Sequence, residues 1–369
     1  MEMKESGKKK SQKPARGYTT GACAQAATRA AALMAATGSL PRLGNSDDGY
    51  PANPGKAGSV EIVLPGGEAA VFQVTMNGDG ACSVVKNAGD DPDITDGVTI
   101  TVRASPRRDG RVLVKGGEGV GLVTREGLPV KPGRPAINPT PLKQIRAEAR
   151  LALPQGADIT VSIPGGGRLA RRTFNPRLGI SGGLSILGTT GRVEPWSVAA
   201  YQDSLLPQLD VARASGVREP VLVPGAKGEK AAIGAGCQPE AVIHAGNFFG
   251  MMLGAARDRG FRQVVLAGHV SKLAKMARGD FDTHSRRSAM PLDVLAECAT
   301  AAGLSGERAA ALEMMPTTEA AIRSLRRAGD FEVLDVAAGR VAARVKKEYG
   351  FKALVLLTDG GGRVVGRSG

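Results

Sequence analysis

The sequence of 369 residues predicts an α+β domain followed by an α/β domain with a mostly parallel sheet. The length exceeds what one ordinary hydrophobic core supports, so two domains are expected. Short β-like runs and turns dominate the first half, whereas continuous apolar runs alternate with helical stretches in the second half. Such alternation is typical of a parallel sheet covered by helices on both faces. We therefore expect a disordered basic tail over residues 1–15, the α+β domain over 16–190 and the α/β domain over 191–369.

The α+β domain is expected to begin with a helix. Thr19, Thr20 and Gly21 open an alanine-rich stretch that runs to about Thr37, and Gly38 follows as a stop signal. Residues 39–59 are rich in Gly, Pro, Asn and Asp, which predicts a loop. A second helix is expected near 141–151. The β-like runs of this half occupy residues 60–64, 70–74, 98–102, 111–114 and 159–163.

The second half is expected to hold buried strands at 184–187, 220–223, 241–243, 264–267 and 353–357. Helices are expected near 197–215, 246–259, 270–278, 290–302, 318–327 and 332–348. In parallel sheets, ligands bind outside the carboxyl ends of the strands. Four of these runs end in small or polar residues, which are Gly188-Thr189-Thr190-Gly191, Pro224-Gly225, His244-Ala245-Gly246-Asn247 and Gly268-His269. This coincidence predicts a ligand site at that edge of the sheet.

The charge of the chain indicates an anionic partner. The formal net charge is +14, and residues 1–16 hold six bases and two acids, which leaves about +10 on the rest of the chain. Such a body attracts nucleic acid, an acidic membrane surface or a polyanionic small molecule. Only 4% of the residues are aromatic, so little is available to stack on unpaired bases, and no recognition helix rich in Lys and Arg is present. The charge alone therefore does not establish nucleic-acid binding.

The cysteines and the apolar segments predict a cytoplasmic protein. Cys23, Cys82, Cys237 and Cys298 are widely spaced and form no CxxC pair, as expected for reduced thiols and not for a disulfide framework or a zinc site. No apolar segment reaches the roughly 18–20 residues that span a bilayer. Gln25 and Arg29 interrupt the apolar stretch after the tail, which makes it a poor signal peptide. We expect no membrane partner and no protein-bound metal.

Two glycine-rich segments are candidate ligand loops. In Gly188-Thr189-Thr190-Gly191 the backbone could approach a ligand closely, and its N–H and hydroxyl groups would bind polar or anionic groups. An ordinary tight turn explains the same residues equally well. Residues 221–232 read as a strand, a turn at Gly225 and the start of a helix, which suits an anion or a cofactor. Because the fingerprints GxGxxG and GxxxxGK[ST] are absent, an ordinary βα turn is an equal alternative.

Two histidines are candidates for chemistry. His269 follows the strand 264–267, where it is well placed for proton transfer or substrate hydrogen bonding. Lys272, near the start of the next helix, would lie close to it and meet a carboxylate. His284 belongs to Asp282-Thr283-His284-Ser285, which predicts either the N-cap of a helix or a ligand loop. A structural role is the alternative for both histidines.

Asp90, Asp91, Asp93 and Asp96 place four carboxylates within seven residues. Their spacing is not that of an EF-hand, and turn formation by Asp side chains explains them well. In an otherwise positive site they would suit an ammonium, a sulfonium or a pyrrole N–H. Residues 116–121 weakly resemble a phosphate loop of small-molecule kinases, but no catalytic Asp or Lys can be assigned to go with it.

The order of the motifs resembles one known family. The matching segments are residues 16–24, 85–93, 116–121, 136–139, 173–195, 246–248, 268–269 and 283–285. They are similar to the cobalt-precorrin-5B C1-methyltransferases of anaerobic cobalamin biosynthesis, and the likeness spans about residues 16–300. It implies an N-terminal α+β domain like the second domain of ribosomal protein S5. The chain departs from the family pattern at Gly246, Ser271 and Asp282, which leaves the individual roles of Ser271 and Asp282 open.

The resemblance implies an enzyme that transfers a methyl group from S-adenosylmethionine to C1 of cobalt-precorrin-5B and gives cobalt-precorrin-6A. S-adenosylmethionine would be the co-substrate. The partner would be an anionic cobalt-tetrapyrrole, whose acetate and propionate carboxylates a basic protein attracts. No nucleic-acid partner is implied, and a homo-oligomer is compatible with the sequence. The alternatives are a paralogue that binds an anion or a tetrapyrrole without this chemistry, and a basic nucleic-acid-binding protein.

We expect the cofactor near Gly188, Thr189, Thr190, Gly191 and Gly225. The catalytic candidates are His269 and Asp91, either of which would manage a pyrrole proton. The expected substrate contacts are Thr19, Thr20, Asp90, Asp93, Asn175, Arg177, Asn247, Lys272, Thr283, His284 and Ser285. Arg171, Arg172 and Lys275 are further candidates for contacts with carboxylates.

Overall fold

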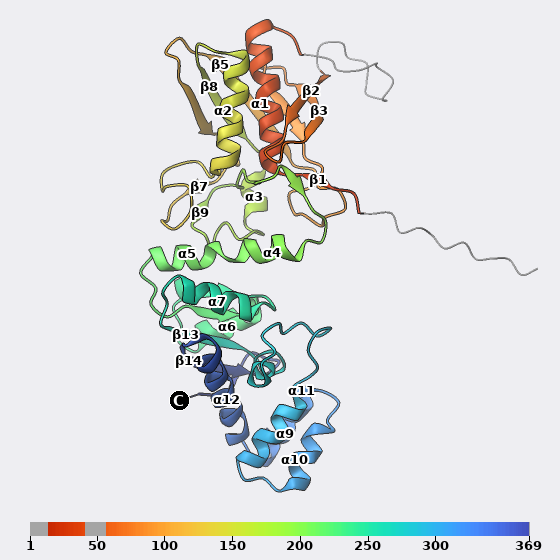
Figure 1. Ribbon diagram of the computed structural model, residues 1–369, viewed down its shortest axis with the longest axis vertical. Helices are drawn as coiled ribbons and strands as arrows, with labels where there is room; N and C mark the ends of the chain where they lie inside the picture. The colour runs from red at the N-terminus through yellow and green to blue at the C-terminus, as the bar shows by residue number, and fades with distance from the viewer. Residues whose placement is uncertain (1–13, 41–56, 369) are drawn as a thin grey trace, which may run out of the picture. The chain divides into compact units, whose positions relative to one another are not determined.

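The computed structural model describes residues 14–40 and 57–368, which form two compact units (Figure 1). The N-terminal unit comprises Met1–Arg125 and Pro129–Val198, and the C-terminal unit comprises Glu126–Leu128 and Ala199–Gly369. Both units combine helices with sheets, so the predicted mixture of α and β structure is confirmed. The expected basic tail, apart from residues 14–15, and most of the expected loop near 39–59 lie outside the described residues.

The N-terminal unit is built on a six-stranded sheet with the order β2-β3-β4-β5-β8-β6. Neighbouring strands are antiparallel, except that β6 and β8 are parallel. Strand β1 pairs with β10 and β7 pairs with β9 in two small ribbons. The strands are β1 (Gly17–Tyr18), β2 (Ala57–Val63), β3 (Ala69–Met76), β4 (Cys82–Val85), β5 (Thr99–Pro106), β6 (Val112–Gly116), β7 (Leu122–Val123), β8 (Ala157–Ser162), β9 (Ile180–Ser181) and β10 (Arg192–Val193).

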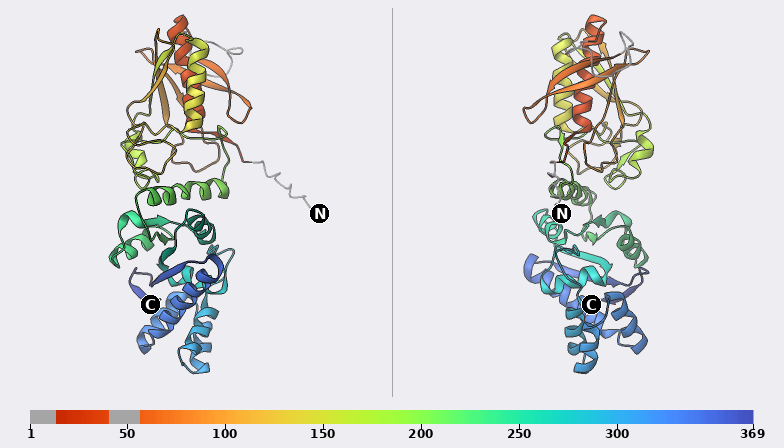
Figure 2. Two further views of the ribbon diagram at one scale, coloured as in Figure 1. Left: turned by 60° about the vertical axis from the view of Figure 1, so that its left-hand side comes forward. Right: turned by 90° about the vertical axis from the view of Figure 1, so that its right-hand side faces the viewer.

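Two long helices, α1 (Thr20–Thr37) and α2 (Pro139–Ala152), lie side by side in this unit (Figure 2). Helix α1 begins as predicted, because the Thr19 hydroxyl accepts a hydrogen bond from the Ala22 N–H at 3.2 Å. It ends at Gly38, whose φ of 76° suits a glycine C-cap. The alanines of α1 up to Ala32 are buried, and the helix packs against β2, β4 and β5, so their small side chains permit the close packing that the sequence predicts. A short helix, α3 (Gly166–Ala170), was not predicted.

Residues 184–187 do not form a strand of the parallel sheet, and that prediction is wrong. They lie in the N-terminal unit, where Leu184 and Ile186 make isolated parallel bridges with Val120 and Ile137. The side chains of Leu184 and Ile186 are buried in the core of that unit, whereas Leu187 is exposed, so the interpretation as a buried run holds for the first two. Glycines on both sides of the run favour single bridges over an extended ladder. The loop at Gly188–Gly191 therefore does not lie at the carboxyl edge of the parallel sheet.

The C-terminal unit contains a five-stranded sheet with the order β12-β11-β13-β14-β15. The first four strands are parallel, and β15 pairs with β14 in the antiparallel direction. The predicted runs at 220–223, 241–243, 264–267 and 353–357 are confirmed as strands, whereas β15 was not predicted. The strands are β11 (Val221–Val223), β12 (Val242–His244), β13 (Gln263–His269), β14 (Lys352–Thr358) and β15 (Val364–Arg367).

Helices connect and cover these strands. The predicted helix over 197–215 is divided into α4 and α5, because Pro207 has no N–H to continue α4. Helix α10 was not predicted. The helices are α4 (Val198–Leu205), α5 (Pro207–Ala214), α6 (Ala226–Gly234), α7 (Phe249–Asp258), α8 (Val270–Leu273), α9 (Leu292–Ala301), α10 (Gly306–Glu313), α11 (Thr318–Ala328) and α12 (Glu332–Tyr349), with 3₁₀ turns η1 (Pro239–Ala241) and η2 (Ala274–Arg278).

The order of the parallel strands marks a position for a ligand. From β11 the chain passes through α6 to β12 on one side, and from β12 it passes through α7 to β13 on the other side of β11. The direction of the connections therefore reverses between β11 and β13. Open α/β sheets bind ligands at such a point, outside the carboxyl ends of the strands. Here those ends are Val223, His269 and, on the next strand, Thr358.

The structure also reports on cysteines, membranes and metals. All four cysteines are free, and burial raises the pKa of the Cys23 thiol to about 12. Over residues 14–40 and 57–368, no helix is long and apolar enough to cross a membrane. Within the same ranges, no group of three or more His, Cys, Asp or Glu side chains is arranged to hold a metal ion.

Candidate functional site

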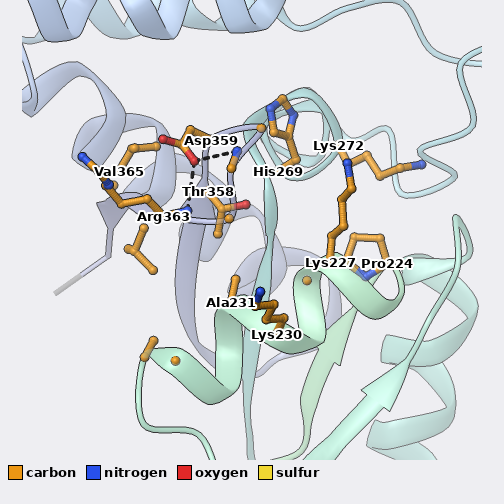
Figure 3. A pocket seen from close by; sticks show the side chains of 18 of the residues that line it. Pro224, Lys227, Lys230, Ala231, His269, Lys272, Thr358, Asp359, Arg363 and Val365 are labelled. Carbon is orange, nitrogen blue, oxygen red and sulfur yellow. Dashed lines mark hydrogen bonds between the residues drawn. The ribbon is translucent and has the colours of Figure 1, made fainter.

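An open cleft of about 1340 Å³ lies at the carboxyl ends of β11, β13 and β14 (Figure 3). Its walls include the strand ends, the first turns of α6 and the loop that joins β14 to β15. The cleft is basic, because its lining contains Lys227, Lys230, Lys272, Arg363 and Arg367 against the acids Asp335 and Asp359. A basic cleft at this position favours ligands that carry several negative groups.

Glycines allow the elements around the cleft to approach one another. A β-carbon at Gly268 would lie 2.9 Å from the Pro224 ring, and one at Gly228 would lie 2.8 Å from it. At Gly225, by contrast, a β-carbon would meet nothing within 4 Å, so this position is open. Gly225 provides no side-chain cap for α6, and the first backbone N–H groups of that helix have no acceptor within the helix. These N–H groups lie in the wall of the cleft.

The loop after β14 is held by Asp359. Its carboxylate accepts hydrogen bonds from the N–H groups of Gly361 at 3.0 Å and Arg363 at 2.9 Å (Figure 3). The N–H of Gly360 donates instead to the Glu319 carboxylate at 3.0 Å. Glu319, in the first turn of α11, thereby ties that helix to the loop.

The same Glu319 oxygen contacts His269. The distance between His269 Nε2 and Glu319 Oε2 is 3.1 Å. On the other side of the ring, Nδ1 accepts the N–H of Ser271 at 3.0 Å and lies 2.6 Å from the Ser271 hydroxyl. Because a backbone N–H can only donate, Nδ1 is the acceptor and the ring proton resides on Nε2. The neutral imidazole is therefore held in one tautomer, with both nitrogens engaged.

A smaller cavity of about 440 Å³ shares His269 and Lys272 with the cleft, and we call it the side chamber. It brings together seven predicted site residues, which are Asn247, His269, Lys272, Lys275, Thr283, His284 and Ser285. The other lining residues are Ser271, Ser288, Met290, Thr317, Thr318 and Glu319. Gly225, the remaining predicted site residue of this unit, lines the cleft.

The wall of the side chamber at 282–285 is a loop. The Thr283 N–H donates to the Asn247 carbonyl at 2.9 Å, and Phe248 and Asp282 form an isolated bridge. The Asp282 carboxylate accepts the His284 N–H at 3.2 Å, as in an Asx turn. The next helix, α9, begins only at Leu292, so the N-cap interpretation of this segment is wrong.

Two lysines face the side chamber without a carboxylate partner. Lys272 Nζ donates to Asn247 Oδ1, and Lys275 Nζ donates to the carbonyls of Thr283 at 3.2 Å and Ser288 at 2.8 Å. Within the described part of the chain neither ammonium forms an ion pair. Burial lowers the pKa of both lysines, and repulsion by Lys272 and Arg278 lowers the pKa of Lys275 further.

The candidates Thr19, Thr20 and Gly188–Gly191 pack against one another in the N-terminal unit. The buried Thr20 hydroxyl lies 3.1 Å from the Ser185 carbonyl and accepts the Leu187 N–H at 3.0 Å. A β-carbon at Gly188 would lie 2.3 Å from the Thr19 hydroxyl oxygen. Internal packing therefore accounts for this glycine, as the tight-turn alternative requires.

The acidic segment of the N-terminal unit is also engaged internally. The Asp93 carboxylate accepts hydrogen bonds from the buried Lys86 ammonium at 2.8 Å and the Thr95 N–H at 2.7 Å. Burial opposes ionisation of Asp93, but these hydrogen bonds outweigh it and lower its pKa. Asp90 accepts the Ala15 N–H at 2.7 Å, and Asp91 accepts the Trp196 N–H at 2.9 Å. The Asp93 contact with Thr95 closes a turn, as the structural alternative expects, whereas Asp90 and Asp91 connect this segment to residues far away in the chain.

Asn175 and Arg177 lie in one turn of the N-terminal unit. Asn175 Nδ2 donates to the Gly183 carbonyl at 2.9 Å, and its Oδ1 accepts the Ser185 hydroxyl at 3.2 Å. Arg177 is half-buried, and its N–H donates to the Phe174 carbonyl at 3.0 Å. Arg171 and Arg172 are exposed.

Sequence reasoning missed Glu319, Thr318 and the loop after β14. An acid in the first turn of a helix is the ordinary choice for the helix dipole, so Glu319 carried no separate signal. Thr318 follows the N-cap Thr317, whose hydroxyl accepts the Ala320 N–H at 3.1 Å. The run Gly360-Gly361-Gly362 after a predicted strand was the one available signal for this wall of the cleft.

The fold and the cleft define a protein of one unit with a mainly antiparallel sheet and one α/β unit, with a basic cleft at the switch point of the parallel sheet of the α/β unit. The chain belongs to the CbiD family. The family model CbiD matches residues 7–195, and the model for the CbiD C-terminal domain matches residues 282–369. The first match covers the N-terminal unit, and the second covers α9–α12 with β14 and β15.

Curated relatives align over most of the chain. A cobalt-precorrin-5B C(1)-methyltransferase from Moorella thermoacetica is 43% identical over 87% of this chain and 85% of its own length. A protein of the same name from Thermoanaerobacter is 41% identical over 85% of this chain and 83% of its own length. A solved crystal structure of a cobalamin biosynthesis protein (cbiD) from Archaeoglobus fulgidus is 26% identical, with a TM-score of 0.39, and covers 74% of this chain and 82% of that chain.

Proposed function

We propose that this protein transfers a methyl group from S-adenosylmethionine to C1 of cobalt-precorrin-5B and gives cobalt-precorrin-6A. The relatives from Moorella thermoacetica and Thermoanaerobacter are named as C(1)-methyltransferases of cobalt-precorrin-5B, and a methyltransferase of this kind implies S-adenosylmethionine as the methyl donor. The observation that carries the proposal is the basic cleft at the carboxyl ends of β11, β13 and β14, with the side chamber beside it. A tetrapyrrole with acetate and propionate groups has the charge that such a lining attracts.

The reaction is a displacement at the methyl carbon. The electron pair of the S–CH₃ bond stays on sulfur, which becomes the thioether of S-adenosylhomocysteine. An electron pair of the macrocycle forms the new bond between C1 and the methyl carbon. The macrocycle thereby gains one positive charge, and the release of a proton removes it. Because sulfur, methyl carbon and C1 must lie in line, positioning supplies much of the acceleration.

His269 is the catalytic residue that we assign to this proton. Its ring lines both cavities, and Glu319 fixes the proton on Nε2 and would stabilise an imidazolium. Nδ1 accepts the released proton after its contacts with Ser271 give way. Glu319 acts through His269, so it is a positioning residue.

The polar groups of the cofactor lie against Gly225 and the first turn of α6 in this proposal. The absence of a side chain at Gly225 and the uncapped N–H groups beside it support this placement. The cofactor contacts of Thr189 and Thr190, and the role of Asp91 as a second proton acceptor, stay predictions. The likeness of the N-terminal unit to the second domain of ribosomal protein S5 and the cytoplasmic location also stay predictions.

The test is an assay of the purified full chain with methyl-labelled S-adenosylmethionine and cobalt-precorrin-5B made by coupling the preceding pathway enzymes. Label at C1 of the macrocycle is the expected result. If verified substrate and folded protein give no transfer, the protein is a paralogue with changed chemistry. Strongly salt-dependent binding to random DNA or RNA would favour the nucleic-acid alternative instead.

A further inference from the structure

We propose that the side chamber is the receptor for one carboxylate group of the ligand that occupies the cleft. The two cavities share His269 and Lys272, so a ligand in the cleft can extend an arm past these residues. The identity of that ligand rests on the proposed function, whereas the carboxylate receptor rests on the chamber itself.

Two buried hydroxyl groups in the chamber wall lack partners. Thr283 is 1% exposed and Thr318 is 2% exposed, and each lines the chamber. Neither Oγ1 has a hydrogen-bond partner within the described residues. A buried hydroxyl without a partner is unfavourable, and such groups are rare in folded proteins. Both oxygens are enclosed in the chamber wall, so a small rotation of each side chain would bring its hydroxyl to a ligand oxygen that accepts the hydrogen bond.

The charge of the chamber points to an anion. Lys275 is 4% exposed, and two carbonyls take only two of its three N–H groups. Lys272 has an amide oxygen as its partner. Burying an ammonium without a counter-charge is costly, and a bound carboxylate supplies that counter-charge.

The neighbouring acids are already engaged by other groups. Glu319 lines the chamber, but its Oε2 accepts from His269 Nε2 and the Gly360 N–H. Asp282 pairs with Arg287 at 2.7 Å. Asp280 and Asp293 both pair with Arg278. Within the described part of the chain, these pairs leave Lys272 and Lys275 without a carboxylate in direct contact, although Asp280 and Asp282 act on them from a distance. Among the described residues Glu319 is the one acid in the chamber lining, so the two lysines give the chamber an excess of positive charge.

A carboxylate fits this set of donors in number and kind. It has two oxygens with about four acceptor sites, which two hydroxyls and two ammonium groups would occupy. The carboxylate has two sources under the proposed function. It belongs either to an acetate or propionate arm of the tetrapyrrole, or to the amino-acid end of S-adenosylmethionine.

The test uses Thr283→Val and Thr318→Val in the full-length protein. Each change replaces an unpartnered hydroxyl with a methyl group of similar size, so neither is expected to lower the thermal stability of the ligand-free protein. Thr300→Val is the control for the same substitution at an exposed position, because its hydroxyl contacts the Ala296 carbonyl on α9, away from both cavities. Lys275→Met is a fourth variant that removes one charge.

Calorimetric titrations would use S-adenosylmethionine, decarboxylated S-adenosylmethionine and cobalt-precorrin-5B. Thermal unfolding in graded sodium propionate provides a simple carboxylate probe. We expect Thr318→Val and Thr283→Val each to weaken the carboxylate ligand about tenfold, with no change for Thr300→Val. Weaker binding of S-adenosylmethionine but not of its decarboxylated form assigns the amino-acid end, whereas weaker binding of cobalt-precorrin-5B alone assigns the tetrapyrrole.

The proposal is overturned if no ligand that the wild-type protein binds, propionate included, loses affinity in the threonine variants. If the wild-type protein transfers no methyl group, the proposed function fails on its own. The comparison of propionate stabilisation between the wild-type protein and Thr318→Val then still decides whether the chamber receives a carboxylate.

Discussion

The predicted site residues of the two units differ in whether their polar groups have hydrogen-bond or ion-pair partners inside the protein. In the N-terminal unit, Thr20, Asn175 and Asp93 have hydrogen-bond partners within the unit. In the C-terminal unit, the Thr283 hydroxyl has no partner within the described residues, and Lys272 has no carboxylate partner there. Similar Thr-, Asn- and Asp-containing motifs therefore form internal hydrogen bonds in one unit and leave donors without partners in the wall of a cavity in the other.

Buried unpartnered oxygens alone do not make this distinction. Gln25 Oε1 and Asp158 Oδ1 in the N-terminal unit also have no hydrogen-bond partner. What separates Thr283 and Thr318 is that both line one chamber together with two lysines. A motif therefore indicates a ligand site when its hydrogen-bond donors lack partners and lie together around one cavity.

The largest expected effect is on the buried pair of the N-terminal unit. Lys86 is 2% exposed, and Asp93→Ala would leave its ammonium buried without a partner. We expect a loss of about 3–5 kcal/mol in the free energy of unfolding, measured by denaturant titration. The double variant Lys86→Met, Asp93→Ala is expected to recover most of that loss, because both charges are then removed.

A different outcome would contradict the structural role of Asp93. If Asp93→Ala keeps its stability but loses affinity for cobalt-precorrin-5B, Asp93 is a substrate contact, as the family resemblance implies, and not a structural group.

A smaller loss of stability is expected for Asn175→Ala. The change leaves the Gly183 carbonyl and the Ser185 hydroxyl without their present partner in a buried turn. We expect a decrease of about 1–3 kcal/mol in the free energy of unfolding. The KM for cobalt-precorrin-5B should stay unchanged at temperatures where the variant is folded, and a selective rise in KM would contradict the structural role.

In the C-terminal unit, Glu319→Ala tests the positioning of His269. We expect kcat to fall about tenfold with KM little changed, because the tautomer and orientation of His269 are no longer fixed. Glu319→Gln keeps a hydrogen-bond acceptor for Nε2 and should restore part of the rate. The double variant with His269→Ala should be no slower than His269→Ala alone, and additive losses would show that Glu319 acts independently of His269.

The smallest effect concerns pH. Burial lowers the pKa of Lys272 and Lys275 below the usual 10.5, so both lose their protons at a lower pH than in the unfolded chain. Affinity for a carboxylate ligand should therefore fall, about twofold to threefold, as pH rises through the lowered pKa values. Over the same interval the ligand-free protein should gain stability, because the unfolded chain binds more protons there.

Calorimetric titrations and thermal unfolding measured across that interval check both directions. Lys272→Met is expected to reduce the pH dependence of both the carboxylate affinity and the stability of the ligand-free protein. Affinity that rises with pH in the wild-type protein would contradict a cationic receptor.

The sequence predicted most of the secondary structure. The N-cap at Thr19, the C-cap at Gly38 and the four parallel strands follow from local signals of helix ends and apolar runs. Residues 184–187 gave the same apolar signal as a strand of the parallel sheet but belong to the N-terminal core. Periodicity reports that a run is buried, and it does not report which sheet the run joins.

The sequence by itself determined the family, the basic character of the chain and the position of His269 at the end of a strand. The tertiary structure decided which polar residues remain without partners. Whether Thr20 or Thr283 is satisfied depends on groups far away in the chain, such as the Ser185 carbonyl for Thr20. Local motifs are set by neighbours within a few residues, whereas the hydrogen bonds of a buried hydroxyl are set by whatever the fold packs against it.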